Sequence, residues 1–382
     1  MSEDSLDEIR KIIDSLDDTI VNALGERQKI IQKVISGKLE RSDDIRDAER
    51  EEELLAKIRQ KAPDAGVDPY FLEQLFREII QYSVRYQTHA LVDHQNEKSQ
   101  EQTIRVSYQG TDGAFSHQAA MKHYKQRYKH VECTGYTRFE EAADAVERGD
   151  VDVSILPIEN TTAGSINDTY DLLNEKDLYI SGEEVLHINH CLMAPEDVHI
   201  SNIRRILSHP QAIAQCSRFL TSLPRCHVES YFDTAMAARK VRDDADLSQA
   251  AIASSYAAEI YGLHILKSNL ANQEQNFTRF VIVGKDPIKC DPQLNCKTSL
   301  IFATIDEKGA LLKCLNLLGD NGINMTKLES RPRIGHPWQS LFYLDIEGNQ
   351  HDPKTADTLE KLRKKSQYLK VLGSYPVREG KW

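Results

Sequence analysis

An apolar stripe at helical spacing fills the first part of the chain, and no strand pattern interrupts it before about residue 92. Isoleucine, leucine and valine recur every three or four residues from Ile9 to Val34, which predicts one long amphipathic helix. Further helices are expected over residues 44–59 and after Pro69, separated by a Pro- and Gly-containing breaker at 61–69. One long helix and two shorter ones bury little apolar surface for a domain that folds on its own. We therefore expect two chains to exchange helices in a dimer.

Polar side chains flank this stripe at spacings that can bring them together. Arg27 and Lys38 are eleven residues apart, which returns to within ~20° of the same helix face. Arg10 lies about 100° off that line, which favours a role in a different site, that of the partner chain. Taken singly, each is best explained as part of a solvated helix face. Two further sets share a face by i, i+3 or i+4 spacing, namely Asp47, Arg50 and Glu51, and Ser83 and Gln87.

Residues 151–173 combine a buried strand, a polar turn and a helix. Branched apolar residues fill 153–158, and apolar positions recur at helical spacing in 166–173. The turn between them, 159–165, carries five side chains that can hydrogen-bond, more than a helix cap requires, and we favour a ligand-binding turn. The alternative is an ordinary strand-to-helix connection with Ser165 as the N-cap.

Composition excludes several classes of function. A net charge of −11 and no basic run longer than three residues argue against a nucleic-acid partner. No apolar run approaches the ~20 residues of a membrane span, and the acidic N-terminus has no signal-peptide pattern. Seven cysteines without a C-x-x-C motif predict reduced thiols and a cytoplasmic protein. No metal site is expected, because no second cluster completes His187, His190 and Cys191.

Three fold classes follow one another along the chain. Residues 1–92 form the all-helical domain and 93–102 a polar linker. Residues 103–285 alternate strands and helices and predict two αβ lobes, the second starting near residue 203. Residues 297–376 follow the order βαββαβ, which predicts an α+β ferredoxin-like module. No G-x-G-x-x-G motif is present, which disfavours a dinucleotide cofactor.

The helical region resembles the all-helical chorismate mutases, which form intertwined dimers of three helices per chain. The resemblance implies that a pericyclic rearrangement of chorismate to prephenate takes place here, with no cofactor or nucleophile. It also implies that arginines bind the two carboxylates, that Lys38 and Gln87 donate to the ether oxygen, and that Glu51 holds the ring hydroxyl. The chorismate-binding set implied is Arg10, Arg27, Lys38, Asp47, Arg50, Glu51, Ser83 and Gln87.

The middle region resembles prephenate dehydratase, whose two lobes are like those of type-two periplasmic binding proteins. The resemblance rests on the turn at 157–161, the 208–211 segment with Gln215, and Thr278-Arg279-Phe280. Taken alone, 208–211 is also a capping box with Ser208 as N-cap, and 278–280 is also simple strand alternation. Thr111 and Ala114 depart from the family's glycine loop. The implied prephenate-binding set is Asn160, Thr161, Ser208, Gln215, Thr278 and Arg279, with Thr278 donating to the leaving hydroxyl.

The end module resembles the ACT domain that binds phenylalanine in this enzyme family. The motif residues are Gly309, Ala310 and Leu311, and Glu329, Ser330, Arg331 and Pro332. Trp338 lies where a conformational reporter is expected.

Together the resemblances imply a multidomain, bifunctional chorismate mutase–prephenate dehydratase that is inhibited by L-phenylalanine and acts as a homodimer. The alternative is a metabolite-binding sensor that has lost the dehydratase activity. A complete rearrangement site argues against the sensor, which has no use for one.

Overall fold

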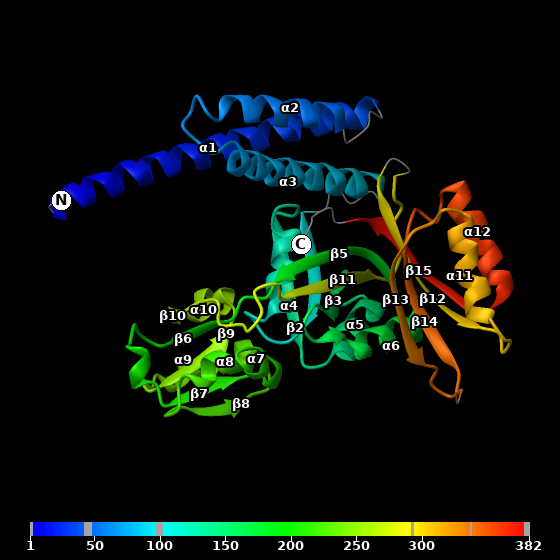
Figure 1. Cartoon of the computed structure of the whole chain (residues 1–382). Coiled ribbons are helices and arrows are strands. Elements are labelled where there is room, and N and C mark those ends of the chain that lie inside the picture. Colours follow the sequence, from blue (N-terminus) through cyan, green and yellow to red (C-terminus); the bar gives the residue numbers. More distant parts are fainter. Residues whose placement is uncertain (1–2, 42–47, 97–101, 292–293, 337, 378–382) are drawn as a thin grey trace. The chain divides into compact units, whose positions relative to one another are not determined.

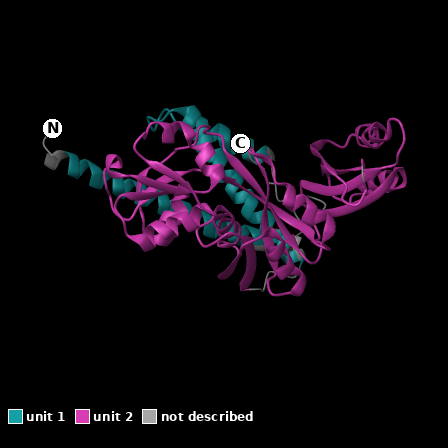
Figure 2. Ribbon diagram, turned by 90° about the horizontal axis from the view of Figure 1, so that it is seen from below, with its two compact units in different colours: residues 1–99, 379–381 teal, residues 100–378, 382 magenta. Residues whose placement is uncertain are grey.

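The computed structural model describes residues 3–41, 48–96, 102–291, 294–336 and 338–377 (Figure 1). Its contacts divide the chain into two compact units (Figure 2): residues 1–99 with 379–381, and residues 100–378 with 382. Each unit is described by itself. No helix of the described residues is both long and apolar enough to cross a membrane.

The first unit consists of three helices, as predicted: α1 (Glu3–Arg41), α2 (Ala48–Lys61) and α3 (Pro69–Gln95). Asp68 caps α3 by accepting a 2.7 Å hydrogen bond from the backbone N–H of Phe71, and Pro69 occupies the first turn, where its missing N–H costs nothing. Helix α3 runs past residue 92, so the first residues of the predicted linker are helical. The predicted start of the second helix at 44 lies outside the described residues.

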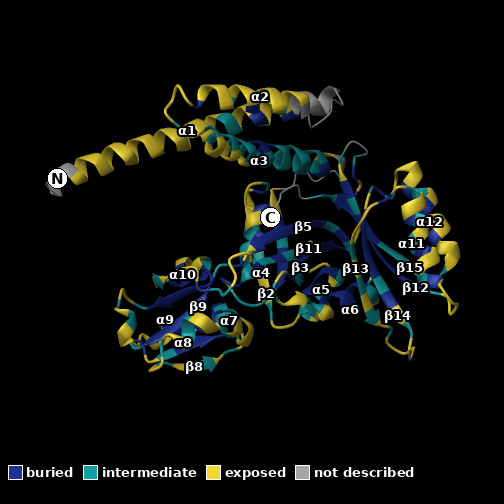
Figure 3. Cartoon of the chain, in the orientation of Figure 1, coloured by how far each residue is buried: buried dark blue, intermediate teal, exposed yellow. Residues whose placement is uncertain are grey.

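Much of α1 is covered by nothing within its own unit. Ile31 and Ile35 are buried, because the C-terminal half of α1 packs on α3. The N-terminal half keeps its apolar stripe in solvent (Figure 3), with side chains 42–66% exposed. An exposed stripe of this length needs a partner surface. The exposed residues are Leu6, Ile9, Ile12, Ile13, Leu16, Ile20, Val21 and Leu24.

The first lobe of the second unit is built on a sheet of order β2-β1-β3-β11-β5, with the short β4 (Gly164–Ser165) paired to β3. The strands are β1 (Thr103–Gln109), β2 (His130–Tyr136), β3 (Val153–Asn160), β5 (Tyr179–His187) and β11 (Phe277–Gly284). Helices α4 (Phe115–Tyr124), α5 (Phe139–Arg148) and α6 (Asn167–Glu175) pack on it. Strand β3 is central and almost wholly buried, which explains why its sequence is largely apolar.

The second lobe has its own sheet, of order β10-β6-β9-β7-β8. Its strands are β6 (Cys191–Ala194), β7 (Arg205–Ser208), β8 (His227–Ser230), β9 (Gln249–Ala253) and β10 (His264–Lys267). Its helices are α7 (Pro210–Gln215), α8 (Ser217–Thr221), α9 (Thr234–Asp244) and α10 (Ser255–Tyr261). The chain enters this lobe after β5 and leaves it before β11, so two segments of the chain connect the lobes. The predicted two-lobed αβ region is confirmed, but the second lobe begins with β6 and not near residue 203 as predicted.

The C-terminal part has the predicted βαββαβ order: β12 (Cys296–Thr304), α11 (Ala310–Asp320), β13 (Met325–Pro332), β14 (Ser340–Glu347), α12 (Pro353–Lys365) and β15 (Ser366–Pro376). The antiparallel sheet order β13-β14-β12-β15 is ferredoxin-like. Both helices cover one face of the sheet (Figure 1).

The other face of this sheet packs closely against the first lobe. Strand β15 contacts β5, and a Cβ at Gly373 would collide with the carbonyl of Ile180. The backbone φ of Gly373 is +141°, which side-chain-bearing residues rarely adopt. Only glycine therefore fits this contact, and the C-terminal sheet belongs to the same compact unit as the lobes.

Candidate active sites

A pocket of about 380 Å³ lies between the two lobes of the second unit. Its walls come from the glycine loop and the ends of β3 and β11 in the first lobe, and from α7 and the start of α9 in the second. Open crevices between lobes are common ligand sites. Residues that line it include Gly110, Phe115, Asn160, His190, Gln215, Asp233 and Thr278.

Asn160 is the central hydrogen-bonding residue of this pocket. Its Oδ1 accepts from the backbone N–H of Thr162 at 3.0 Å and of Ala163 at 2.8 Å. Because backbone N–H groups only donate, these contacts fix which end of the amide is oxygen. The Asn160 Nδ2 therefore donates, to Oδ1 of Asn276 at 2.8 Å and to Oγ1 of Thr278 at 2.9 Å.

This polarity determines what the Thr278 hydroxyl can do. One oxygen lone pair is occupied by the Asn160 amide, so the hydroxyl proton points elsewhere. Thr278 donates to no other residue in the described part of the chain, and it lines the pocket. Its O–H is thus available to a bound molecule.

Gln215 connects the lobes at the same place. From α7 its Nε2 donates to Oγ1 of Thr162 at 2.7 Å, and its Oε1 accepts from Nδ2 of Asn276 at 3.1 Å. The expected ligand turn therefore supplies Asn160 to the pocket, and Thr162 of the same turn bonds to Asn160 and Gln215. The alternative cap is wrong, because Ile166 is the N-cap of α6 and the hydroxyl of Ser165 donates to Glu329 at 2.8 Å.

Three of the expected prephenate-binding residues do not line the pocket. Ser208 is fully buried, and as the last residue of β7 it donates to the carbonyl of Ile252 on β9 at 2.6 Å. The cap of α7 is His209 instead, so the predicted Ser208 capping box is wrong. Thr161 begins the turn after β3, and its hydroxyl donates to the carbonyl of Gln275 at 3.1 Å.

Arg279 is the third, and here the prediction of substrate contact is wrong because side chains alternate along β11. The guanidinium lies on the opposite side of β11 from Thr278 and faces the C-terminal sheet. It binds Glu183 at 2.8 Å, Asp345 at 2.7 Å and the hydroxyl of Tyr375 at 2.9 Å. Lys297 adds a second cation, 3.0 Å from Glu183. The cluster is buried and its two cations balance its two carboxylates.

Replacing Asp345 by asparagine is expected to destabilise the second unit. Burial opposes the charge of Asp345, but Arg279 and Lys297 outweigh it and hold the pKa below its ordinary value of 3.8. A lowered folded-state pKa stabilises the fold above pH 3.8, and this contribution disappears as the pH falls through the folded-state pKa. Leaving Arg279 with one carboxylate fewer should cost about 3 kcal/mol.

Urea unfolding followed by circular dichroism tests this at pH 7 and between pH 5 and pH 3. The D345N variant should lose stability at pH 7 and show a shallower decline toward low pH. Asp357→Asn, at an exposed ion pair with Lys361, is the control. Equal effects of the two substitutions would refute the role of the buried cluster.

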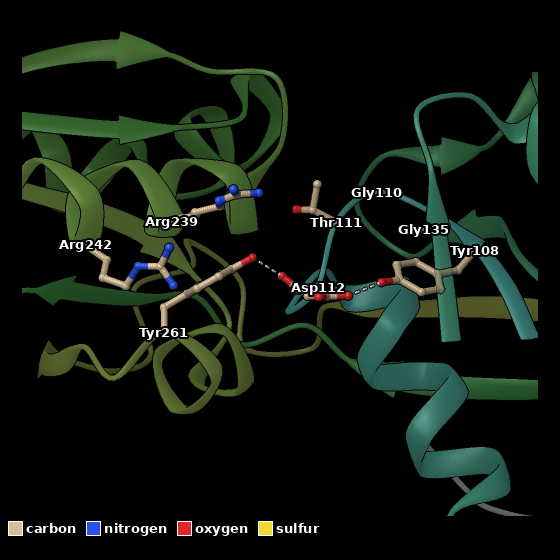
Figure 4. A pocket seen from close by; sticks show the side chains of 8 residues that line it. All are labelled: Tyr108, Gly110, Thr111, Asp112, Gly135, Arg239, Arg242 and Tyr261. Atoms are coloured by element: carbon tan, nitrogen blue, oxygen red, sulfur yellow. Dashed lines mark hydrogen bonds between the residues drawn. The ribbon is translucent and has the colours of Figure 1, made fainter. Parts of the chain in front are cut away.

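A second pocket, of about 470 Å³, lies on the other side of Gly110 (Figure 4). Its charged groups already have partners in the described structure: the Asp112 carboxylate accepts from the hydroxyl of Tyr108 at 2.8 Å, and Arg242 pairs with Asp243 at 2.6 Å. The hydroxyl of Tyr261 donates to the backbone carbonyl of Asp112, which joins the lobes. In the described structure, the residues of this pocket therefore hold the two lobes together.

In the helical unit, α1 and α3 bring three of the eight expected chorismate-binding residues together. Arg27 donates to the hydroxyl of Ser83, and Gln87 Nε2 lies 3.3 Å from the carbonyl of Ser83. The Oε1 of Gln87 is buried without a partner among the described residues. Burial lowers the pKa of Arg27. An unpaired buried amide oxygen beside a half-buried cation is typical of a polar site.

The other five expected residues are described only in part. Arg10 is exposed and pairs with Asp7 at 3.1 Å; seventeen residues of helix place it about 25 Å from Arg27. Arg50 is exposed and Glu51 half-buried on α2. The side chain of Lys38 and the whole of Asp47 lie outside the described residues.

The ferredoxin-like module holds its two motifs on different elements. Gly309 is the N-cap of α11 with φ +75°, followed by buried Ala310 and half-buried Leu311. On β13, Glu329 accepts from Ser165 and Arg331 pairs with Asp171 at 2.6 Å. The second motif is thus bonded to the turn and helix that follow Asn160. Ser330 and Pro332 are exposed.

Comparison with known proteins agrees with this division. Residues 9–88 match the family model for chorismate mutase type II, and residues 106–288 match that for prephenate dehydratase. The bifunctional chorismate mutase/prephenate dehydratase of Escherichia coli K12 is 36% identical over 375 residues, 98% of this chain and 97% of that protein. This chain belongs to the same family. It is a bifunctional enzyme with both domains.

Solved structures cover the second unit of this bifunctional enzyme. The prephenate dehydratase of Arthrobacter aurescens, in complex with L-Phe, is 29% identical, with a TM-score of 0.64 over 72% of this chain and 90% of that one. A structure described as a novel quorum-quenching acylase, GqqA, is 34% identical, with a TM-score of 0.65 over 72% of this chain and 98% of that one. Similar folds thus carry different described activities.

Three residues of this hydrogen-bond network were missed from the sequence: His190, which lines the pocket, and Thr162 and Asn276, which bond to Asn160. Asn276 stands two residues before Thr278, so strand alternation predicts the same face for both. Thr162 belongs to the turn that was singled out. His190 was considered only as a zinc ligand, and the described residues contain no cluster of three metal-binding side chains.

Proposed function

We propose that the pocket between the lobes is the dehydratase site, with Thr278 as hydrogen-bond donor to the leaving hydroxyl of prephenate. The reaction expels CO₂ and hydroxide and forms an aromatic ring, so it needs orientation and help for the leaving group. The direction of the Asn160–Thr278 hydrogen bond is the observation that carries this proposal. A hydroxyl is a weak acid, so its contribution is a hydrogen bond that strengthens as charge develops on the leaving oxygen.

We propose that Arg27, Ser83 and Gln87 form part of the mutase site. Rearranging chorismate requires a flexible dianion to be held in its reactive shape. Arg27 suits a carboxylate because its guanidinium donates two parallel hydrogen bonds, and Gln87 offers an amide to the ether oxygen. Lys38, Asp47, Arg50 and Glu51 complete the proposed set, and Arg10 serves the site of a second copy of the chain.

We infer that the enzyme is a homodimer through α1. The apolar stripe that α1 exposes supports this, because a second copy offers a matching stripe. Such an exchange also brings Arg10 to the other chain's Arg27 region. A cytoplasmic location is proposed from the seven cysteines, which are all free thiols.

We propose that residues 297–376 are an ACT domain through which L-phenylalanine inhibits the dehydratase. The ferredoxin-like topology supports this, as does the relative crystallised with L-Phe. The binding residues proposed are Gly309–Leu311 and Glu329–Pro332. Because Glu329 and Arg331 bond to the segment after Asn160, a ligand that competes for them would shift that segment between two states.

One time course tests these assignments together. The purified enzyme receives chorismate alone, with and without phenylalanine, and prephenate and phenylpyruvate are measured over time. Phenylpyruvate should appear after a prephenate lag, and phenylalanine should suppress it without stopping prephenate formation. Accumulating prephenate without phenylpyruvate would refute the dehydratase assignment. No conversion at all would favour the sensor, and phenylpyruvate insensitive to phenylalanine would refute the regulatory assignment.

A further inference from the structure

His190 is a buried, titratable side chain at the centre of the pocket between the lobes. It precedes β6, where the chain enters the second lobe, and it is 2% exposed. Its Nε2 lies 2.8 Å from Oε1 of Gln215. The ring also meets Phe115 edge-on, with centroids 5.5 Å apart. Nothing in the proposed reaction uses this side chain directly.

The hydrogen-bond network determines which ring nitrogen of His190 carries the proton. The backbone contacts of Asn160 make its Nδ2 the donor to Asn276 Oδ1. The other end of the Asn276 amide must then donate, to Oε1 of Gln215. That atom is thereby an oxygen, and an amide oxygen only accepts. His190 therefore donates from Nε2.

The second ring nitrogen completes this assignment. Nδ1 of His190 is buried and has no partner among the described residues, as expected for an unprotonated nitrogen with its lone pair enclosed. Burial also lowers the pKa of His190, which keeps the ring neutral. A buried polar atom without a partner carries a desolvation penalty, and such groups in native structures commonly have a functional reason.

The amide of Gln215 has two orientations of nearly the same shape, related by rotation about its last torsion. Two donors hold its oxygen in place: Asn276 and His190. In this orientation Gln215 Nε2 donates to Thr162 Oγ1, and Thr162 in turn donates to Asn160 Oδ1 at 2.7 Å. The donors therefore follow one order: Gln215 donates to Thr162, Thr162 donates to Asn160, and the Asn160 amide donates to Thr278.

We propose that His190 is a positioning residue of the dehydratase reaction: its Nε2–H holds the Gln215 amide, which in turn holds the Thr162 hydroxyl against Asn160, the residue that bonds to Thr278. This rests on the proposed function of Thr278. Without this donor, Asn276 alone holds the Gln215 oxygen, which weakens the positioning of Gln215 and of the Thr162 hydroxyl that donates to Asn160. Substrate binding, which depends on the whole pocket, should change little.

A matched pair of substitutions separates this role from simple packing. Glutamine places an amide nitrogen near the position of Nε2, whereas asparagine places one only near Nδ1. His190→Asn should lower the dehydratase kcat by about 30-fold with little change in KM, because small misplacements of reacting groups have effects of that order. His190→Gln should restore most of kcat. Steady-state rates with prephenate measure both, and mutase turnover of the same chain verifies the enzyme concentration.

His187 provides a control. It is exposed, three residues away on the same segment, and its Nε2 bonds only to the backbone carbonyl of Glu274 at 2.8 Å. His187→Asn should leave both activities unchanged. Wild-type kcat in H190N, or equal loss in H190N and H190Q, would overturn the proposal. A Thr278→Ala variant that keeps full dehydratase activity would instead refute the site assignment, and the His190 pair would then report on Gln215 alone.

Discussion

Replacing Thr278 by alanine is expected to lower the dehydratase kcat by a factor of about 10²–10³, the usual effect of removing one donor from a developing negative charge. The Asn160 amide occupies the oxygen of Thr278 and leaves its proton for the substrate. Alanine removes that proton together with the oxygen that accepts from Asn160. The mutase activity, which belongs to the other unit, should not change. Rates from chorismate and from prephenate on one preparation measure the two effects.

Two further variants sharpen this test. Thr278→Ser retains the hydroxyl and should retain most of kcat, while Thr221→Ala, whose hydroxyl bonds to the carbonyl of Ser217 on an exposed helix, should change neither activity. Full dehydratase activity in the alanine variant would remove Thr278 from the mechanism. Loss of both activities would indicate a folding defect instead.

Replacing Arg27 by alanine is expected to lower the mutase activity and leave the dehydratase activity unchanged. A guanidinium that binds a carboxylate and stabilises charge in the transition state contributes a factor of about 10³ in kcat/KM. The half-buried position of Arg27 beside Ser83 makes it the best-supported chorismate ligand among the described residues. Dehydratase turnover of added prephenate should remain at the wild-type level.

Lys29 offers the matched control on the same helix. Its side chain is 69% exposed and pairs with Glu26, so Lys29→Ala should leave the mutase unchanged. Arg27→Lys should recover only part of the loss, because an ammonium lacks the planar fork. Mutase activity in R27A equal to that of K29A would exclude Arg27 from the site.

Much of the fold could be predicted from periodicity. The change from helical spacing to alternating strands and then to βαββαβ locates the three regions, because burial imposes those patterns directly. The end of α3 was missed because residues 93–95 are polar, and nothing in a polar sequence marks where a helix of good formers stops. Caps were also misplaced: His209 rather than Ser208 caps α7, since Ser208 is held by its neighbouring strand.

The sequence predicted several residues of the candidate site correctly, but it did not predict the contacts that these residues make. Asn160, Gln215 and Thr278 do line one pocket, and they come from segments more than fifty residues apart. Arg279 fails because a charged residue next to a site residue in a strand faces away from it, and only tertiary structure shows the buried carboxylates that receive it. The sequence could not identify His190 and Asn276 as members of the site, because the direction of their hydrogen bonds is determined only in the folded structure.

The alternation of β11 has a consequence for how this gene can vary. Thr278 and Arg279 are neighbours that serve opposite sides of one strand, one in an open pocket and the other in a sealed cluster of charges. A single-codon insertion or deletion upstream in this strand would exchange their sides, sending the guanidinium into the pocket and a hydroxyl into the charge cluster. Substitutions in β11 can therefore accumulate one position at a time, whereas changes in its length cannot. Length variation among descendants of this gene is consequently confined to the loops outside β11.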